Sequence, residues 1–353
     1  MKKRSRINTD PQLQKNNRQI IYINDEVLMN KAVKKENRLP REIWVAAISL
    51  KGIWPVATIE KRMKDIVERM ENVYAFEPDI ICLPEMVNIS WVDEAEKSKT
   101  LSDVAEDEIS HGPTTSMLAD IARKQHCYIT CPIVTKKDGH FYNTTLLLNR
   151  QGKTEGLFHK IHPTSTEIIP DSYFKGGGVT PGPVKQDVVN TDFGKVGMQI
   201  CYDAEWTDGW NSLKEEGAEI VCFSSQGPFL NTLRNHAWLN NYYIVSATGE
   251  NSQIIDITGD LIALDGEFAR WVCAPVNLEK ELLHIWPHVK KFDAIQKKYE
   301  RKINFKIYHP ENWATLESLD PDIKVKDILK EYEIPTYDEQ IREATGIQNK
   351  YRL

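Results

Sequence analysis

Two side chains in separate parts of the chain could together perform nucleophilic chemistry. Cys201, in "VGMQICYDAEW", follows a short apolar run and precedes a polar turn. A thiol at the carboxyl end of a buried strand that opens a helix lies close to free main-chain N–H groups, which stabilise a thiolate or a developing oxyanion. Glu85, in "DIICLPEM", ends another apolar run, where a carboxylate costs free energy unless it has a partner or a function. The pair could serve as a nucleophile and a general base.

A third stretch, "GLFHKIHPTSTE", places Lys160 between Phe158 and Ile161, with Glu167 seven positions later. Each signal taken singly also has an ordinary explanation. A lone cysteine is most often a small core residue, and a carboxylate or lysine at the end of a strand is most often a solvated charge. The individual residues leave both interpretations open.

The surrounding elements predict how these side chains are positioned. "IWVAAISL" (43–50) is typical of a buried strand, residues 59–74 have apolar residues at helical spacing, and "DIICLPEM" is a second strand, which together predict a βαβ unit. The same alternation recurs up to about residue 280. We therefore predict one α/β domain over residues 41–280, with two sheets and outer helices.

The two ends of the chain have a different composition. Residues 1–40 are polar and lack periodicity, which predicts an N-terminal arm that is partly ordered at most. Residues 281–353 form a charged C-terminal extension with two short predicted helices and no second independent core. We expect this extension to wrap over the domain or over a neighbouring subunit.

Composition limits the possible partners and the location. The net charge is −6, which does not favour nucleic acid as a partner, and no apolar stretch is long enough for a membrane helix. The basic start lacks the apolar segment of a signal peptide, so we expect a cytoplasmic protein. Most of the six cysteines lie in apolar runs, as reduced buried cysteines do.

The three stretches together resemble the carbon–nitrogen hydrolase (nitrilase) superfamily over about residues 43–280. The resemblance rests on "LPE", "HKxxPTxxE" and "VGxxICYD", in that order. It implies Glu85 as general base, Lys160 as oxyanion-binding group and Cys201 as nucleophile of a covalent thioester intermediate, with Glu167 positioning the lysine and the substrate. It also implies a four-layer αββα sandwich, a homodimer or higher homo-oligomer, and no metal or organic cofactor.

The branch of the superfamily is less sharply indicated. Nitrilases proper usually follow the cysteine with Trp-Glu, whereas this chain has Tyr202 and Asp203. We therefore predict an amidase or N-carbamoyl hydrolase of small molecules. The alternatives are a nitrilase acting on nitriles and a catalytically silent binding protein with the same fold. Trp91, Tyr202 and Trp206 are candidate walls of the substrate pocket, although ordinary core packing explains each of them equally well.

Overall fold

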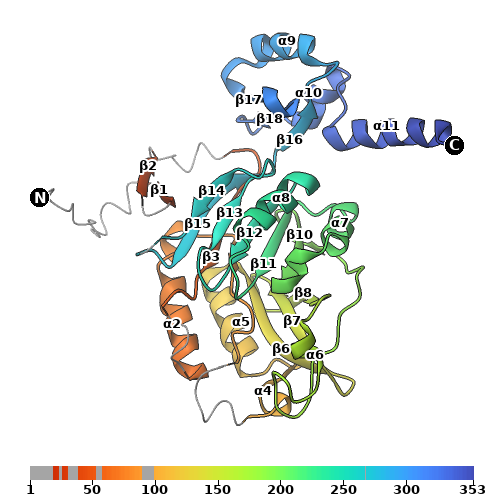
Figure 1. Cartoon of the computed structure of the whole chain (residues 1–353). Coiled ribbons are helices and arrows are strands. Elements are labelled where there is room, and N and C mark those ends of the chain that lie inside the picture. Colours follow the sequence, from red (N-terminus) through yellow and green to blue (C-terminus); the bar gives the residue numbers. More distant parts are fainter. Residues whose placement is uncertain (1–18, 24–25, 31–38, 53–57, 90–98, 267) are drawn as a thin grey trace, which may run out of the picture. The chain divides into compact units, whose positions relative to one another are not determined.

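A computed structural model describes residues 19–23, 26–30, 39–52, 58–89, 99–266 and 268–353. The chain divides into two compact units (Figure 1), of which the larger consists mainly of Trp44–Ala274 and the smaller mainly of Pro275–Leu353. In addition, β1 (Gln19–Ile23) and β2 (Glu26–Asn30) pair as an antiparallel hairpin within the predicted arm.

Two sheets form the centre of the larger unit. The first has the order β15 (Trp271–Asn277), β3 (Glu42–Ile48), β4 (Ile80–Cys82), β6 (Tyr128–Lys137), β7 (His140–Leu148) and β8 (Thr154–His159), with β5 (Glu106–Asp107) paired to β6. The second has the order β14 (Leu261–Leu264), β13 (Gln253–Ile255), β12 (Tyr243–Ala247), β11 (Ile220–Ser224), β10 (Lys195–Ile200) and β9 (Val189–Asn190). The central strands are parallel, and their apolar runs are continuous because both faces of each sheet are covered.

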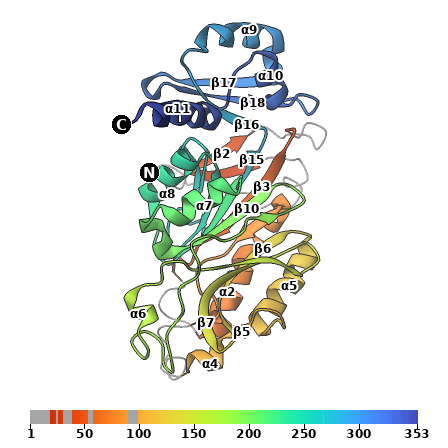
Figure 2. The same ribbon diagram turned by 90° about the vertical axis from the view of Figure 1, so that its right-hand side faces the viewer.

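Helices cover the outer face of each sheet. The first sheet packs against α2 (Ile59–Glu71) and α5 (Pro113–Gln125), and the second against α7 (Asp208–Glu215) and α8 (Leu230–Asn240). Between the sheets, the Cys82 thiol on β4 donates to the Phe223 carbonyl on β11 across 3.7 Å. The layers therefore run helix, sheet, sheet, helix (Figures 1 and 2), which confirms the predicted αββα sandwich.

The helix predicted over residues 59–74 shows how the sequence determines this packing. Met63, Ile66 and Met70 recur at helical spacing and are buried in α2, and Thr58 caps its first turn by accepting from the Lys61 N–H at 3.2 Å. Arg62 is buried on the same helix, which the pattern did not predict. Two further short helices, α4 (Leu101–Val104) and α6 (Ser165–Ile168), lie in loops, as does the 3₁₀ turn η2 (Tyr74–Phe76).

The smaller unit differs from the prediction of an extension without its own core. Its antiparallel sheet has the order β16 (Lys280–His284), β18 (Trp313–Ser318) and β17 (Ile303–Tyr308). Its helices are α9 (Val289–Tyr299), α10 (Val325–Glu331) and α11 (Tyr337–Tyr351), and two 3₁₀ turns are η4 (Glu300–Lys302) and η5 (His309–Glu311). Leu283, Phe292, Leu316 and Ile328 belong to a separate apolar cluster. The prediction failed because each element contributes only one narrow apolar face within a highly charged sequence.

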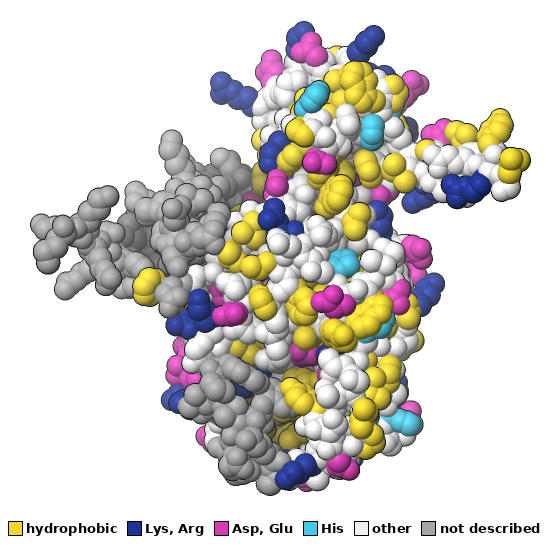
Figure 3. Space-filling view, in the orientation of Figure 1, with side chains coloured by type: hydrophobic (Ala, Val, Ile, Leu, Met, Phe, Trp, Pro, Cys, Tyr) yellow, Lys and Arg dark blue, Asp and Glu magenta, His cyan; other side chains and the backbone are white. Residues whose placement is uncertain are grey.

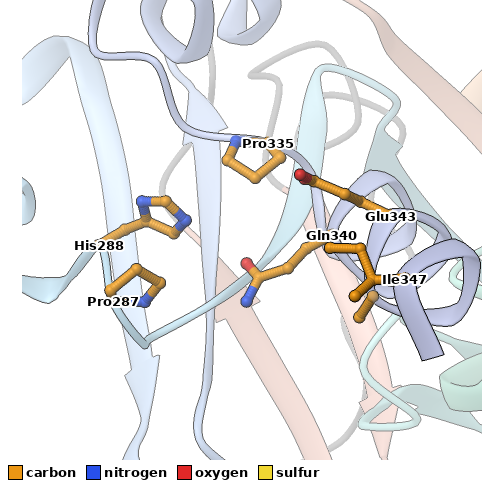
Figure 4. A pocket seen from close by; sticks show the side chains of 7 residues that line it. Pro287, His288, Pro335, Gln340, Glu343 and Ile347 are labelled. Atoms are coloured by element: carbon orange, nitrogen blue, oxygen red, sulfur yellow. The ribbon is translucent and has the colours of Figure 1, made fainter. Parts of the chain in front are cut away.

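The last helix, α11, has no buried residue, and apolar side chains are exposed along it in the space-filling view (Figure 3). An open pocket beside it is seen in Figure 4 and is lined by Pro287, His288, Pro335, Gln340, Glu343, Ala344 and Ile347. This pocket contains none of the predicted site residues. Among the helices within the described ranges, none combines the length and the apolar content needed to cross a membrane.

Candidate active site

Cys201 stands at a sharp turn between β10 and the 3₁₀ helix η3 (Cys201–Glu205). Its φ angle is +45°, a left-handed conformation that costs a non-glycine residue about 1–2 kcal/mol. Asp203 supports the turn, because its Oδ2 accepts from the Ile200 N–H at 3.1 Å. Of the six cysteines, all free and all within the described ranges, the other five are buried and Cys201 is partly exposed. The turn thus presents this thiol at the end of its strand.

Lys160, Glu85 and Glu167 are in direct contact. The Lys160 ammonium donates to Glu85 Oε1 at 2.9 Å and to Glu167 Oε1 and Oε2 at 3.1 and 2.9 Å. Only 2% of the lysine is exposed. Burial by itself lowers the pKa of Lys160, but the negative charges of Glu85 and Glu167 and the hydrogen bond to Glu85 outweigh it and hold the pKa above its ordinary value. The lysine is therefore a permanently charged donor in a water-poor site.

A helix cap fixes Glu167. Thr164 and Glu167 form a capping box at α6, in which the Thr164 N–H donates to Glu167 Oε2 at 2.7 Å and Thr164 Oγ1 accepts from the Glu167 N–H at 3.3 Å. The "TSTE" sequence carries this Thr-x-x-Glu pattern. One carboxylate therefore caps the helix and binds the lysine ammonium at the same time.

The protonation state of Cys201 follows from its surroundings. Burial of the sulfur, followed by the negative charge of Glu85, raises the pKa of the thiol to about 12. Lys160 and hydrogen bonds from the Ser225 hydroxyl and the Gln226 N–H oppose this rise. At neutral pH the resting group is the thiol, so attack on a substrate requires a base to remove its proton.

Two residues of the site were missed by the sequence analysis. Asn143 on β7 donates through Nδ2 to Glu85 Oε1 at 2.8 Å and to Glu167 Oε1 at 3.2 Å. Tyr173 lies in the loop after α6 and is 47% exposed, and partial burial of its phenol, followed by the charges of Glu85 and Glu167, raises its pKa to about 12. The sequence "FYNTTLLL" alternates as an ordinary strand does, and nothing in it marks the asparagine as different.

The glycine-rich segment 176–182 packs against the main chain of the lysine and of Glu167. The Val179 N–H donates to the Glu167 carbonyl at 2.9 Å, and the Gly182 N–H donates to the Lys160 carbonyl at 2.8 Å. A Cβ on Gly178 would collide with the Ile168 carbonyl oxygen and approach the Glu167 carbonyl oxygen to 3.0 Å. Glycine is therefore required for the close approach of this loop.

The predicted pocket aromatics have different outcomes. Tyr202 and Trp206 are each 38% exposed and contact edge to face, with ring centroids 4.8 Å apart. Trp206 also stacks on His162 at 4.2 Å. Both aromatics thus lie at the turn that carries Cys201 rather than in the core, and contact with substrate remains a prediction. Trp91 lies outside the described residues. Among the described residues, no group of three or more His, Cys, Asp and Glu could hold a metal ion.

Comparison with known proteins agrees with this architecture. The model of the carbon–nitrogen hydrolase family matches residues 45–280, and the chain belongs to that family. It is accordingly an enzyme of the class that hydrolyses carbon–nitrogen bonds.

Individual relatives are distant. Omega-amidase NIT3 of Saccharomyces cerevisiae is 25% identical over 270 residues, which cover 68% of this chain and 89% of that protein. Nitrilase 1 of Arabidopsis thaliana is 32% identical over 111 residues, which cover 31% of this chain and 30% of that protein. The crystal structure of Saccharomyces cerevisiae Nit3 superimposes with a TM-score of 0.57 at 18% identity, covering 74% of this chain and 96% of that chain, and supports the fold.

Proposed function

We propose that this enzyme hydrolyses a small amide or N-carbamoyl substrate through a thioester on Cys201. Glu85 is the general base and acid, and Lys160 binds the oxyanion. The observation that carries the proposal is the arrangement of the Glu85 carboxylate. Its Oε1 accepts from Lys160 at 2.9 Å and from Asn143 at 2.8 Å, whereas its Oε2 accepts no hydrogen bond from the residues that the structure describes. One oxygen is thus held and the other is available for a proton.

Acylation uses these groups in order. Glu85 Oε2 takes the thiol proton as the Cys201 sulfur forms a bond to the amide carbon. The carbonyl oxygen becomes an oxyanion that accepts from the Lys160 ammonium and from the Tyr202 N–H at the start of η3, where main-chain N–H groups lack partners within the helix. The carbon–nitrogen bond then breaks, and the proton on Glu85 passes to the leaving nitrogen, which departs as ammonia or an amine.

Deacylation uses the same base again. Glu85, ionised once more, removes a proton from water as the water oxygen attacks the thioester carbon. The carbon–sulfur bond breaks, the carboxylic acid is released, and the thiol is restored by the proton on Glu85. Because Glu85 acts in both half-reactions, its carboxylate must stay beside both Lys160 and the Cys201 sulfur. The hydrogen bonds that hold its Oε1 allow this.

The amide class is favoured over nitriles by the turn after the nucleophile. The sequence there is Tyr202-Asp203, and the similarity to omega-amidase NIT3 extends over 68% of the chain, whereas that to Nitrilase 1 extends over 31%. A nitrile substrate would use the same thiol and base, and is one outcome of the test.

The test is turnover and intact-mass analysis across primary amides, N-carbamoyl amino acids and nitriles. We expect ammonia release from one or more amide or carbamoyl compounds, with an acyl adduct on Cys201 at short times. Cys201→Ala should abolish both, and Cys127→Ala, a buried cysteine outside the site, should retain both. Turnover that survives Cys201→Ala would refute the mechanism. Turnover of nitriles alone would reassign the substrate class.

A further inference from the structure

We propose that Asn143 is a positioning residue that holds the two carboxylates of the site in one fixed arrangement around Lys160. Asn143 stands opposite the lysine one residue beyond the β7–β8 ladder, which pairs Thr144 with His159, and the Lys160 N–H donates to the Asn143 carbonyl at 2.8 Å. Directly opposed residues in an antiparallel pair place their side chains on the same face. The register of the hairpin thus brings the amide beside the ammonium, and only 1% of Asn143 is exposed.

The hydrogen bonds of the two side chains form a closed ring. Lys160 Nζ donates to Oε1 of Glu85 and Oε1 of Glu167, and Asn143 Nδ2 donates to the same two oxygens, at 2.8 and 3.2 Å. The two carboxylates share a single hydrogen-bonded ammonium in this buried site, an excess of negative charge that the buried Arg62 guanidinium offsets electrostatically at Glu85. The amide supplies two neutral N–H donors to that excess charge without adding a titrating group.

This arrangement determines how Glu85 presents its second oxygen. With Oε1 held by two donors from different directions, the carboxylate plane is fixed and Oε2 is left unbonded by the described residues. With Lys160 as its only donor, the carboxylate could rotate and offer either oxygen to the ammonium. Asn143 therefore acts through Glu85 and Glu167. Its effect on turnover rests on the proposed function, but its effect on the thiol does not.

The test compares Asn143→Ala and Asn143→Asp with Thr145→Val. Thr145 is two residues further on the same face of β7 and is equally buried, and its hydroxyl has no hydrogen-bond partner among the described residues, so it controls for disturbance of the strand. The first readout is the rate of Cys201 alkylation by iodoacetamide as a function of pH, followed by peptide mass analysis. The second is kcat and KM on whichever substrate the wild type turns over. Thermal unfolding of each variant shows whether it is folded.

The two Asn143 variants should respond to pH in opposite ways. In Asn143→Ala each of the two carboxylates loses a neutral donor, so the acid limb of the Cys201 alkylation profile should move to higher pH. In Asn143→Asp a third carboxylate faces the other two, so the rate of Cys201 alkylation at pH 8 should fall below that of the wild type. The rate should recover on acidification, when the introduced carboxyl is protonated and can donate one hydrogen bond. The kcat value should fall by about 10²-fold in Asn143→Ala with little change in KM.

Thr145→Val should match the wild type in all these measurements. If both folded Asn143 variants keep the wild-type alkylation profile, Asn143 does not position the carboxylates and the inference is wrong. If the profiles shift as expected while Cys201→Ala still turns over substrate, the inference stands and the proposed function fails. If all three variants lose alkylation rate and kcat equally, in parallel with a lower temperature of thermal unfolding, the role of Asn143 is merely structural and the inference is also wrong.

Discussion

The main-chain N–H of His162 donates to Asp203 Oδ1 across 2.7 Å. His162 follows the lysine of the site by two residues, and Asp203 follows the cysteine by two residues. The other oxygen of the same carboxylate accepts from the Ile200 N–H at 3.1 Å. A single buried carboxylate therefore joins the segment that follows a strand of one sheet, and carries Lys160, to the end of a strand in the other, which carries Cys201.

Removal of this carboxylate should cost both stability and activity. Asp203→Ala leaves the N–H groups of Ile200 and His162 without their acceptor, and each buried unpaired donor costs about 1–3 kcal/mol. We expect a lower free energy of unfolding in urea and a loss of turnover greater than the loss of folded protein. Asp208→Asn is the control, because Asp208 is exposed, its Oδ2 lies 3.4 Å from His162 Nε2 and its Oδ1 accepts from the Gly209 N–H at 2.7 Å, so it bonds neither Ile200 nor the His162 N–H. A folded Asp203→Ala enzyme with full activity would contradict this role.

The same contact predicts a pH dependence of stability. The hydrogen bond to Asp203 raises the pKa of His162, partial burial opposes the rise, and the charges of Asp203 and Asp208 add to it. The folded pKa lies above the unfolded value of 6.5, so the stabilisation is complete below pH 6.5 and is lost as pH rises through the folded value. His162→Gln should therefore destabilise the protein more at pH 5.5 than at pH 9 in urea unfolding. An equal effect at both pH values would show that the imidazolium contributes nothing.

The close approach of the glycine-rich loop gives a steric prediction. Gly178→Ala places a methyl group against the carbonyls of Ile168 and Glu167, so the α6 cap and the Glu167 carboxylate must shift. Turnover should fall by about 10-fold or more, since displacement of a positioned group by an ångström can cost 10²-fold. The matched change Gly346→Ala lies in α11, where the new methyl group meets no described atom within 4 Å beyond its own stretch of helix, and it should raise stability by about 0.5–1 kcal/mol. Wild-type kinetics for Gly178→Ala would show that the close approach of this loop does not determine the position of Glu167.

The smaller unit has its own pH-sensitive group. Burial raises the pKa of Glu281 to about 7, with the charges of Glu279, Asp338 and Glu339 adding to the rise and Lys326 opposing it. Ionisation of this carboxyl is therefore unfavourable in the folded state, so stability falls as pH rises from about 4.5 to above 7. Glu281→Gln should stabilise the protein by about 1–3 kcal/mol at pH 8 and have little effect at pH 4, measured by thermal unfolding. A larger stabilisation by Glu281→Gln at pH 4 than at pH 8 would show that the surroundings stabilise the ionised carboxylate.

Much of the site could be predicted because its charged residues interrupt apolar runs. Glu85, Lys160 and Cys201 each follow a strand, the first two in one sheet and Cys201 in the other. Asn143 could not be predicted, because its importance depends on the register between two strands rather than on its own neighbours in sequence. Tyr173 comes from a loop whose path no periodicity determines.

The fold was predictable to a similar degree. The βαβ repeats predicted both sheets and their outer helices, because burial on two faces produces long apolar runs. The core around Phe292 and Leu316 was missed, since a three-stranded sheet with one covered face needs only alternate apolar residues and these are diluted by charge. Arg62 was assigned to no role, yet it is buried and donates to the Ile89 carbonyl at 2.6 Å and the Glu85 carbonyl at 3.4 Å.

The two-sheet origin of the site has a consequence for folding. Glu85, Asn143 and Lys160 come from one sheet, whereas Cys201, Ser225 and Gln226 come from the other. Neither half of the sandwich holds the complete set, so an intermediate in which one sheet has formed and the other has not docked would be inert toward substrate. Recovery of turnover during refolding would thus mark the moment at which the halves join, later than the appearance of secondary structure.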